Sequence, residues 1–279
     1  MSVPPNLAAV LAEFPSVLIG YSGGVDSALL AVVATRVLGG ERAVAALGVS
    51  PSLARAQHKQ ARDVARRFAL NLVEVRTDEL DDPQYARNPT NRCYFCKREL
   101  WTKLRRVAHA RGLAVIADGT NADDPGGHRP GLRAADEHGI RSPLAEAGLT
   151  KTAVRAAARS LGLPIWDAPA APCLASRVLY GLEVTPDRLR EVEQGETVLR
   201  DAGVRGDLRV RHRGDEARIE VAPSEFARVR AARHGIGRRL LALGFRRVTL
   251  DLAGYRQGSL LATGASPSLE VLAQHPATR

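Results

Sequence analysis

The sequence predicts an α/β fold built on a parallel sheet, followed by a smaller α+β domain. Three observations lead to this prediction. Short apolar runs alternate with longer helical stretches through the first half of the chain, as in parallel sheets with crossover helices. A glycine-rich loop joins the first apolar run to a long apolar helix, and a proline-rich segment later ends the alternation.

The elements of the first domain follow one another in the order expected of a parallel sheet. Strands are expected over Val17–Tyr21, Ala43–Val49, Asn71–Arg76 and Ala114–Asp118. Helices are expected over Asn6–Glu13, Ser27–Leu38, Leu53–Phe68, Phe95–Ala110 and Lys151–Leu161, the last capped by Thr150. The polar segment Gly119–Pro143 follows a strand directly, at the edge where open α/β sheets bind ligands.

A proline-rich stretch over Pro164–Pro172 interrupts regular structure and indicates a domain boundary. We expect a first domain over residues 1–172, a small α+β domain over 173–262 and a loosely ordered tail over 263–279. The second domain is expected to contain helices over Pro186–Asp201 and Ser224–Leu243 and strands over Asp207–His212, Ala217–Val221 and Arg247–Leu252.

Composition narrows the class of protein. The chain has 279 residues, 45% of them hydrophobic, and a formal net charge of +10 supplied almost entirely by arginine. Arginine suits phosphate and carboxylate partners, although an arginine-rich chain can also reflect the base composition of its gene. The sequence has no apolar run of about 18 residues and no recognisable signal peptide, so we expect a cytoplasmic protein without a membrane span.

The segment between the first strand and the second helix has the character of a phosphate-binding loop. It reads Ser22, Gly23, Gly24, Val25, Asp26 and Ser27. Its backbone N–H groups and the helix N-terminus converge on one point, and its glycines let an anion approach closely. Asp26 is expected to order the loop or to help hold Mg²⁺. The loop lacks the Gly-Lys-Ser/Thr ending of a Walker A motif.

This loop matches the SGGxDS motif of the ATP pyrophosphatase (PP-loop) superfamily. The resemblance implies an adenine nucleotide α-hydrolase-like domain that binds ATP and Mg²⁺, directs a substrate oxygen to the α-phosphate and releases pyrophosphate. It also places the adenine contacts on Gly48, Val49 and Ser50, at the end of the second strand, and further nucleotide contacts on Gly119, Thr120 and Asn121. The loop alone does not distinguish amidotransferases, NAD synthetases, tRNA thiolases and other sulfur transferases.

Further segments are more specific. They are Asp118–Asp124, His128–Arg133, Ser142–Leu144, Gly148–Lys151 and Pro172–Arg177. With them the chain closely resembles the LarE family, ATP-dependent sulfur transferases that build the nickel-pincer nucleotide cofactor of lactate racemase. The resemblance implies a trimer or hexamer that adenylates a carboxylate of pyridinium-3,5-biscarboxylate mononucleotide and converts it to a thiocarboxylate.

The resemblance also suggests roles for residues of the second domain. Cys173 occupies the family's sulfur-donor position, and a thiolate is well suited to attack an acyl adenylate. Ser176 and Arg177 follow it, and a nearby positive charge favours the thiolate.

Four residues are candidates for binding the substrate. Arg209 and Arg211 alternate with apolar residues on an expected strand, so they share one face, which either clamps the substrate phosphate or faces solvent. Arg133 and Glu196 are the other two candidates for the substrate pocket.

Cys93 and Cys96 form a C-x-x-C pair, and with Cys173 they supply three thiolates. Three cysteines can hold a [4Fe–4S] cluster whose open iron carries a transferable sulfide. In family members without the pair, the resemblance implies that the cysteine gives up its own sulfur. A zinc site with His128 as fourth ligand, a disulfide switch or unrelated thiols are the alternatives.

Two other functions fit part of the sequence. An iron–sulfur-dependent tRNA thiolase also combines a PP-loop with three cysteines, and the positive charge suits RNA. However, only 4% of residues are aromatic and the sequence shows no separate RNA-binding module, so nucleic acid is not the expected partner. A nucleotide sensor, or an inactive subunit of a larger assembly, is the non-enzymatic alternative, and release of pyrophosphate would exclude it.

Overall fold

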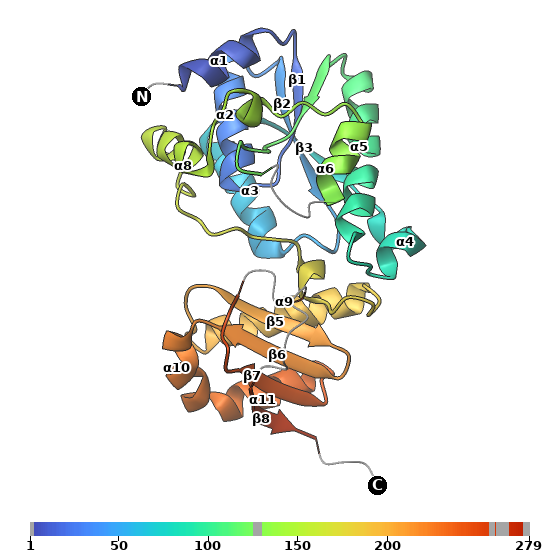
Figure 1. Cartoon of the computed structure of the whole chain (residues 1–279), viewed down its shortest axis with the longest axis vertical. Helices are drawn as coiled ribbons and strands as arrows, with labels where there is room; N and C mark the ends of the chain where they lie inside the picture. Colours follow the sequence, from blue (N-terminus) through green and yellow to red (C-terminus); the bar gives the residue numbers. More distant parts are fainter. Residues whose placement is uncertain (1–2, 125–129, 257–259, 261–267, 276–279) are drawn as a thin grey trace. The chain divides into compact units, whose positions relative to one another are not determined.

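A computed structural model describes residues 3–124, 130–256, 260 and 268–275 of the chain. The chain forms two compact units, coloured along the sequence in Figure 1. The first unit comprises Met1–Asp82 and Asn91–Ala171, and the second comprises Pro83–Thr90 and Pro172–Arg279. Within the described residues, no helix has the length and apolar character needed to cross a bilayer.

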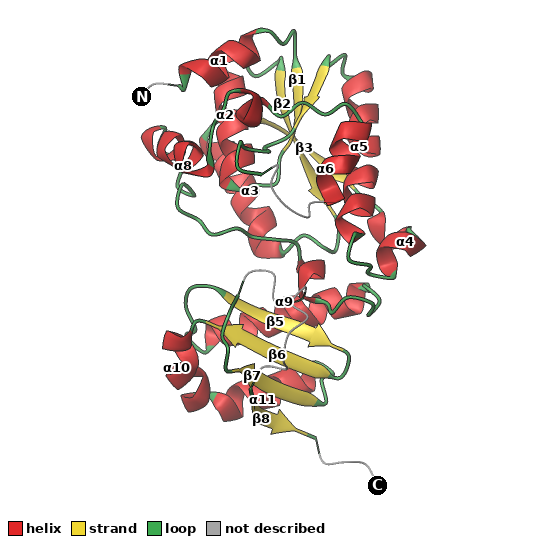
Figure 2. Ribbon diagram, in the orientation of Figure 1, coloured by secondary structure: helices red, strands yellow, loops and turns green. Residues whose placement is uncertain are grey.

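The first unit contains the expected parallel sheet. Its strands are β1 (Val17–Gly20), β2 (Ala43–Val49), β3 (Asn71–Arg76) and β4 (Val115–Ala117). They lie in the order β3-β2-β1-β4, and every pair is parallel. Figure 2 shows strands of this sheet in yellow, with red helices on either side. Because all four strands point the same way, the loops that follow them meet at one edge of the sheet.

Helices cover both faces of this sheet. They are α1 (Pro5–Ala12), α2 (Val25–Leu38), α3 (Arg55–Arg67), α5 (Arg92–Ala110), α6 (Pro130–Glu137), α7 (Pro143–Glu146) and α8 (Lys151–Ser160), with a 3₁₀ turn at Glu79–Asp81. Helices α1, α2, α3 and α8 share one hydrophobic core with the sheet, and α5 and α6 share another on its opposite face. Helix α2 is apolar on nearly all sides because it packs against the sheet and against α1 and α8. Thr150 caps α8 by accepting a hydrogen bond from the Ala153 amide at 3.3 Å, as expected.

The segment Gly119–Pro143 contains a helix that the sequence did not predict. Helix α6 buries Ala134 and Ala135 against α5. The helix is only eight residues long, and the prolines and glycines around its start are typical of a loop, which hid it in the sequence.

The second unit is a mixed four-stranded sheet with helices. Its strands are β5 (Leu208–Arg213), β6 (Glu216–Val221), β7 (Arg247–Asp251) and β8 (Leu269–Gln274), in sequential order. Strands β6 and β7 are parallel, and the other two pairs are antiparallel. The helices are α4 (Pro83–Ala86), α9 (Pro186–Asp201), α10 (Phe226–Ala231) and α11 (Arg233–Ala242), with 3₁₀ turns at Leu174–Arg177 and Pro223–Glu225.

Strand β8 corrects the expectation of a loosely ordered tail, because Leu269–Gln274 pairs with β7 along its length. Helix α11 packs against β8, and a Cβ at Gly237 would come within 2.5 Å of the Ala273 side chain. The other residues of the expected tail lie mainly outside the described residues. The helix expected over Ser224–Leu243 is divided into α10 and α11 at Ala232.

The segment Pro83–Thr90 packs with the second unit although it precedes the rest of that unit by many residues. Asn88 is buried and has a positive φ of 56°. Its side-chain amide donates hydrogen bonds to the carbonyl oxygens of Val178, Leu179 and Leu182, at 3.3, 2.8 and 2.9 Å. The chain therefore passes between the two units three times, whereas a single boundary after residue 172 implies one passage.

Candidate functional site

The glycine-rich loop connects β1 to the first turn of α2, and its two serine hydroxyls hold it together. The Ser22 amide donates to Ser27 Oγ at 3.1 Å, and the two hydroxyl oxygens lie 3.1 Å apart. Ser27 Oγ also donates to the Gly24 carbonyl at 3.2 Å, and the Gly24 amide donates to Ser22 Oγ at 3.3 Å. The hydroxyls thus fix the loop around the N-terminus of α2, where a helix stabilises a bound anion.

Helix α3 supports the loop from outside. Gly23 has a positive φ of 75°, and a Cβ there would lie 2.6 Å from the Ala61 side chain, so only glycine fits. Gln57 and Gln60 donate to the carbonyl oxygens of Ser22 and Gly23, each at 3.3 Å. Sequence reasoning missed these two glutamines, since each is an ordinary polar residue of an amphipathic helix.

Asp26 anchors the loop to two later segments of the same unit. Its Oδ1 accepts a hydrogen bond from Asn121 Nδ2 at 3.1 Å, and its Oδ2 forms an ion pair with Lys151 Nζ. Lys151 opens α8, and its amide donates to Asp123 Oδ2 at 2.7 Å. Lys151 was not among the expected site residues, although it lies in a segment that the family resemblance uses. Lys151 therefore places its ammonium group near the phosphate loop, in addition to the partial positive charge of the α2 N-terminus.

Gly119 lies directly against the loop. A Cβ at Gly119 would lie 2.8 Å from the Ser27 amide nitrogen, so the backbones of the two segments touch. The next residue, Thr120, is held by Asp118, whose Oδ1 accepts the Thr120 amide hydrogen bond at 3.0 Å. The structure thus brings Gly119 and Asn121, two of the expected nucleotide contacts, to the phosphate loop.

The expected adenine-binding residues Gly48, Val49 and Ser50 lie at the carboxyl end of β2. The Ser50 hydroxyl donates to Glu79 Oε1 at 2.5 Å, and the Val49 carbonyl accepts from the Thr77 amide at 3.1 Å. Glu79 is buried, and its Oε2 has no hydrogen-bond partner among the described residues. The Ser50 side chain is therefore engaged by Glu79, which leaves mainly the backbone of this segment for a base.

In the second unit, Arg177 organises the turn that carries Cys173. Its guanidinium pairs with Glu196 through Nε and Nη2, at 2.9 and 3.3 Å. Its Nη1 donates to the carbonyl oxygens of Pro172 and Cys173 and to Ser176 Oγ, at 2.5, 3.0 and 3.0 Å. Ser176 Oγ in turn donates to the Cys173 carbonyl at 2.7 Å. These contacts fix the backbone on both sides of Cys173 and leave its side chain partly exposed.

Arg209 and Arg211 are buried on β5, which excludes the alternative of a solvated strand face. Arg211 donates to Glu220 through Nε and Nη2, at 2.8 and 2.7 Å, and to the Ser176 carbonyl at 2.9 Å. Two of its guanidinium nitrogens are therefore occupied by the single oxygen Oε2 of Glu220. Arg211 connects the strand to the turn that holds Cys173.

Arg209 has a different environment from Arg211. Its guanidinium lies 4.9 Å from the centre of the Tyr255 ring, and its Nη1 donates to the Leu208 carbonyl at 2.6 Å. Among the described residues no carboxylate forms an ion pair with it. Burial and the nearby charge of Arg177 lower the pKa of Arg209. A buried guanidinium without a carboxylate partner is suited to receive an anionic ligand. Tyr255 was not expected at this site.

Arg133, the remaining candidate for substrate binding, lies on α6 in the first unit. Its guanidinium lies 4.2 Å from the centre of the Tyr94 ring and pairs with Glu137 at 3.2 Å. Its side chain is largely exposed.

Cys93 and Cys96 lie in the first turns of α5, three residues apart and therefore on one face of the helix. Cys93 is exposed and Cys96 is partly buried. Cys173 belongs to the second unit. Among the described residues no group of three or more His, Cys, Asp or Glu side chains is arranged to hold a metal ion. His128, the alternative zinc ligand, lies outside the described residues.

Comparisons with known proteins agree with the nucleotide-binding geometry. A family model described as NAD synthase matches residues 9–108, which include the phosphate loop. An uncharacterised protein of Synechocystis sp. is 44% identical over 257 residues, which cover 91% of this chain and 95% of that protein. An uncharacterised protein of Methanocaldococcus jannaschii is 29% identical over 240 residues, with coverages of 86% and 90%.

A third relative has a defined activity. The pyridinium-3,5-bisthiocarboxylic acid mononucleotide synthase of Lactiplantibacillus plantarum is 34% identical over 268 residues, which cover 96% of this chain and 97% of that enzyme. Both units of the structure fall within this similarity. The chain therefore belongs to the LarE family of ATP-dependent sulfur transferases.

Proposed function

We propose that this protein adenylates a carboxylate of pyridinium-3,5-biscarboxylate mononucleotide and then converts it to a thiocarboxylate, for the nickel-pincer cofactor of lactate racemase. The observation that carries the proposal is a PP-loop braced by Ser22 and Ser27 in a chain that also fixes the backbone around Cys173 with Arg177. The similarity to the synthase over 96% of the chain supports the choice of substrate.

The first unit would carry out the activation. The loop N–H groups and the N-terminus of α2 would bind the β- and γ-phosphates of ATP, and Lys151 would add positive charge beside Asp26. Asp26 is the carboxylate of the loop itself and would contact Mg²⁺, which would neutralise the departing pyrophosphate. The substrate carboxylate attacks the α-phosphorus, the bond from that phosphorus to the β-phosphate oxygen breaks, and pyrophosphate leaves. The product is an acyl adenylate.

The second unit would carry out the sulfur transfer. Arg209 would bind the substrate phosphate, because it is a buried guanidinium without a carboxylate partner among the described residues. Arg177 and Ser176 would position the turn that carries Cys173. Sulfur attacks the carbonyl carbon of the adenylate, and AMP leaves with the oxygen that belonged to the carboxylate.

We further propose that Cys93, Cys96 and Cys173 hold a [4Fe–4S] cluster. Two thiols on one face of α5, one of them exposed, suit two of the ligands. When bound, such a cluster supplies a sulfide on its open iron. Without it, Cys173 gives up its own sulfur, its Cβ–S bond breaks, its Cα proton is lost and dehydroalanine remains.

The test begins with anaerobic purification and a visible absorbance spectrum. The protein is then incubated with ATP, Mg²⁺ and the biscarboxylate mononucleotide, and protein and product are analysed by mass spectrometry. A brown protein that keeps its mass while forming thiocarboxylate supports the cluster. A colourless protein that loses the mass of H₂S at Cys173 supports the cysteine as donor and refutes the cluster. Thiolated tRNA in place of a thiolated mononucleotide would overturn the proposed substrate.

Three variants separate the cysteine roles. Cys93→Ser and Cys96→Ser are expected to lose colour and multiple turnover together if the cluster is present, and Cys173→Ser is expected to abolish transfer in either mechanism.

We also propose that the protein is a homo-oligomer, a trimer or a hexamer. Light scattering of the purified protein tests this state, and a monomer at micromolar concentration contradicts it.

A further inference from the structure

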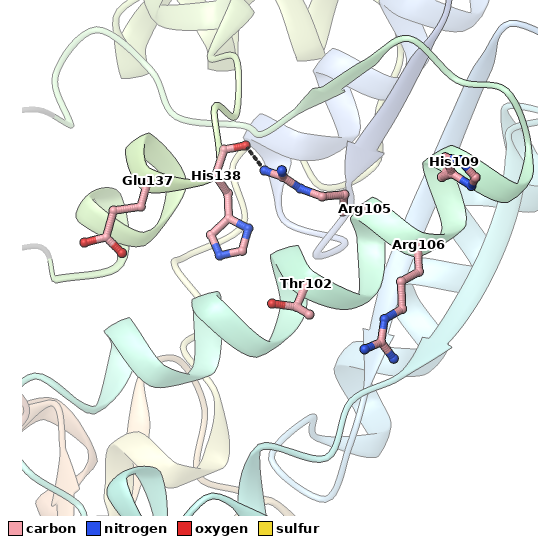
Figure 3. Close-up of a pocket in the computed structure, with 6 residues that line it drawn as sticks. All are labelled: Thr102, Arg105, Arg106, His109, Glu137 and His138. Carbon is pink, nitrogen blue, oxygen red and sulfur yellow. Dashed lines mark hydrogen bonds between the residues drawn. The ribbon is translucent and has the colours of Figure 1, made fainter.

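A second group of positive side chains lies on the first unit, apart from the phosphate loop. It lines a cavity of about 540 Å³ beside α5 and the end of α6, drawn in Figure 3. The lining residues are Thr102, Arg105, Arg106, His109, Glu137 and His138. A volume of this size is within the range of small-molecule sites.

Four of these residues form one stripe on α5. Thr102, Arg105, Arg106 and His109 are spaced as neighbours on one face of a helix. Because a crossover helix runs opposite to the strands it connects, this second half of α5 lies toward the amino ends of the strands. The phosphate loop lies at their carboxyl ends. The cavity is therefore distinct from the ATP site.

The stripe keeps most of its positive charge. Arg105 Nη2 donates to the His138 carbonyl at 2.7 Å, as the dashed line in Figure 3 shows, and this neutral partner leaves the guanidinium charge uncompensated. Arg106 is exposed and forms no ion pair among the described residues. Glu137 is the acidic residue of the lining, but its carboxylate accepts a hydrogen bond from Tyr94 at 2.6 Å and pairs with Arg133 at 3.2 Å.

His138 is an incompletely satisfied residue at the same place. Its Nδ1 is buried and has no hydrogen-bond partner among the described residues. Burial and the nearby charge of Arg105 lower the pKa of His138, so its ring is neutral at about pH 7. An unsatisfied buried nitrogen is destabilising, and a bound ligand or water is a common reason for one to persist.

We propose that this cavity binds a phosphorylated small molecule whose diphosphate group lies on Arg105 and Arg106. The two guanidiniums come from successive residues of α5 and extend in different directions in Figure 3, so a ligand with several anionic oxygens, such as a diphosphate, can contact both side chains more readily than a single carboxylate can. The remaining volume, between α5 and His138, is sufficient for more than the diphosphate alone. Inorganic pyrophosphate and a nucleoside diphosphate share this chemistry.

The test uses the full chain with the PP-loop saturated by α,β-methylene-ATP and Mg²⁺. Inorganic pyrophosphate and ADP are titrated separately by calorimetry into the wild type, into the double variant Arg105→Gln/Arg106→Gln, and into Arg36→Gln. Arg36 is a matched control because it is an exposed arginine on α2 of the same unit. Thermal melting checks that each variant is folded, which is expected because all three arginines are exposed.

We expect the double variant to bind one diphosphate fewer per chain than the wild type, or to bind it roughly tenfold or more weakly. Arg36→Gln is expected to match the wild type. The tighter of the two probes identifies the source of the diphosphate. Equal stoichiometry and affinity in the wild type and the double variant, for both probes, would overturn the proposal, and so would an absence of binding to the wild type beyond the saturated PP-loop.

Discussion

The contact between Gly119 and the phosphate loop predicts a specific effect of Gly119→Ala on ATP binding. The new Cβ would lie 2.8 Å from the Ser27 amide nitrogen and 3.0 Å from its Cα, whereas ordinary contact begins at 3.4 Å. Both neighbours are backbone atoms, so the loop must move by about 0.6 Å. Overpacking of this kind costs about 1–3 kcal/mol of unfolding free energy.

The larger effect is expected on the nucleotide, because the displaced amide lies in the loop that would hold its phosphates. A misplacement of about 1 Å can cost roughly a hundredfold in function, so we expect ATP affinity to fall by about tenfold or more. Calorimetric titration with α,β-methylene-ATP measures the affinity, and thermal melting measures stability. Gly40→Ala is the matched control, because a Cβ at that position would have no other atom within 4 Å. Wild-type affinity in Gly119→Ala would refute the reasoning.

Three further predictions concern the second unit. A lysine in place of Arg177 cannot make both the bidentate pair with Glu196 and the contacts to the backbone carbonyls. In Arg177→Lys, thiocarboxylate formation should therefore fall about a hundredfold while ATP binding is unchanged. A wild-type rate of thiocarboxylate formation would contradict this prediction. Arg211→Ala removes the ion-pair partner of buried Glu220 and should lower the unfolding free energy by about 3–5 kcal/mol in urea titrations. A loss below about 1 kcal/mol would contradict this prediction. Burial lowers the pKa of His212 despite its bond to Glu191, so the folded ring stays neutral where the unfolded one gains a proton. Unfolding free energy should therefore decrease as pH falls below about 6.5, with a smaller slope in His212→Gln; identical slopes would exclude His212 as the cause.

Much of the first unit was predictable because its signals are local. The strands are short apolar runs, α2 is apolar on nearly all sides, and the loop at Ser22–Ser27 carries its own glycines. The edge at which the loop and Gly119 meet followed from the parallel order of the strands alone.

The features that were missed depend on contacts between distant residues. Lys151 reaches Asp26 only because α8 packs against α2. Strand β8 becomes regular through pairing with β7, and its sequence has no clean alternation of buried and exposed residues. Asn88 joins the second unit through three distant carbonyls, which no spacing in the sequence reveals.

The contacts of the two arginines on β5 could not be predicted from the sequence either. Alternation placed Arg209 and Arg211 on one face, but their partners come from other elements. Glu220 lies opposite Arg209 on β6, yet its carboxylate pairs with Arg211. This difference leaves Arg209, stacked on Tyr255, as the better candidate for binding an anion.

The most direct test of the central claim follows one oxygen atom. The biscarboxylate mononucleotide is labelled with ¹⁸O in its carboxylates and incubated with ATP, Mg²⁺ and the anaerobic protein, and the AMP is analysed by mass spectrometry. If the carboxylate attacks the α-phosphate and sulfur then displaces AMP, the AMP carries one ¹⁸O for each thiocarboxylate formed. Unlabelled AMP, or ADP in place of AMP and pyrophosphate, would contradict activation as an acyl adenylate.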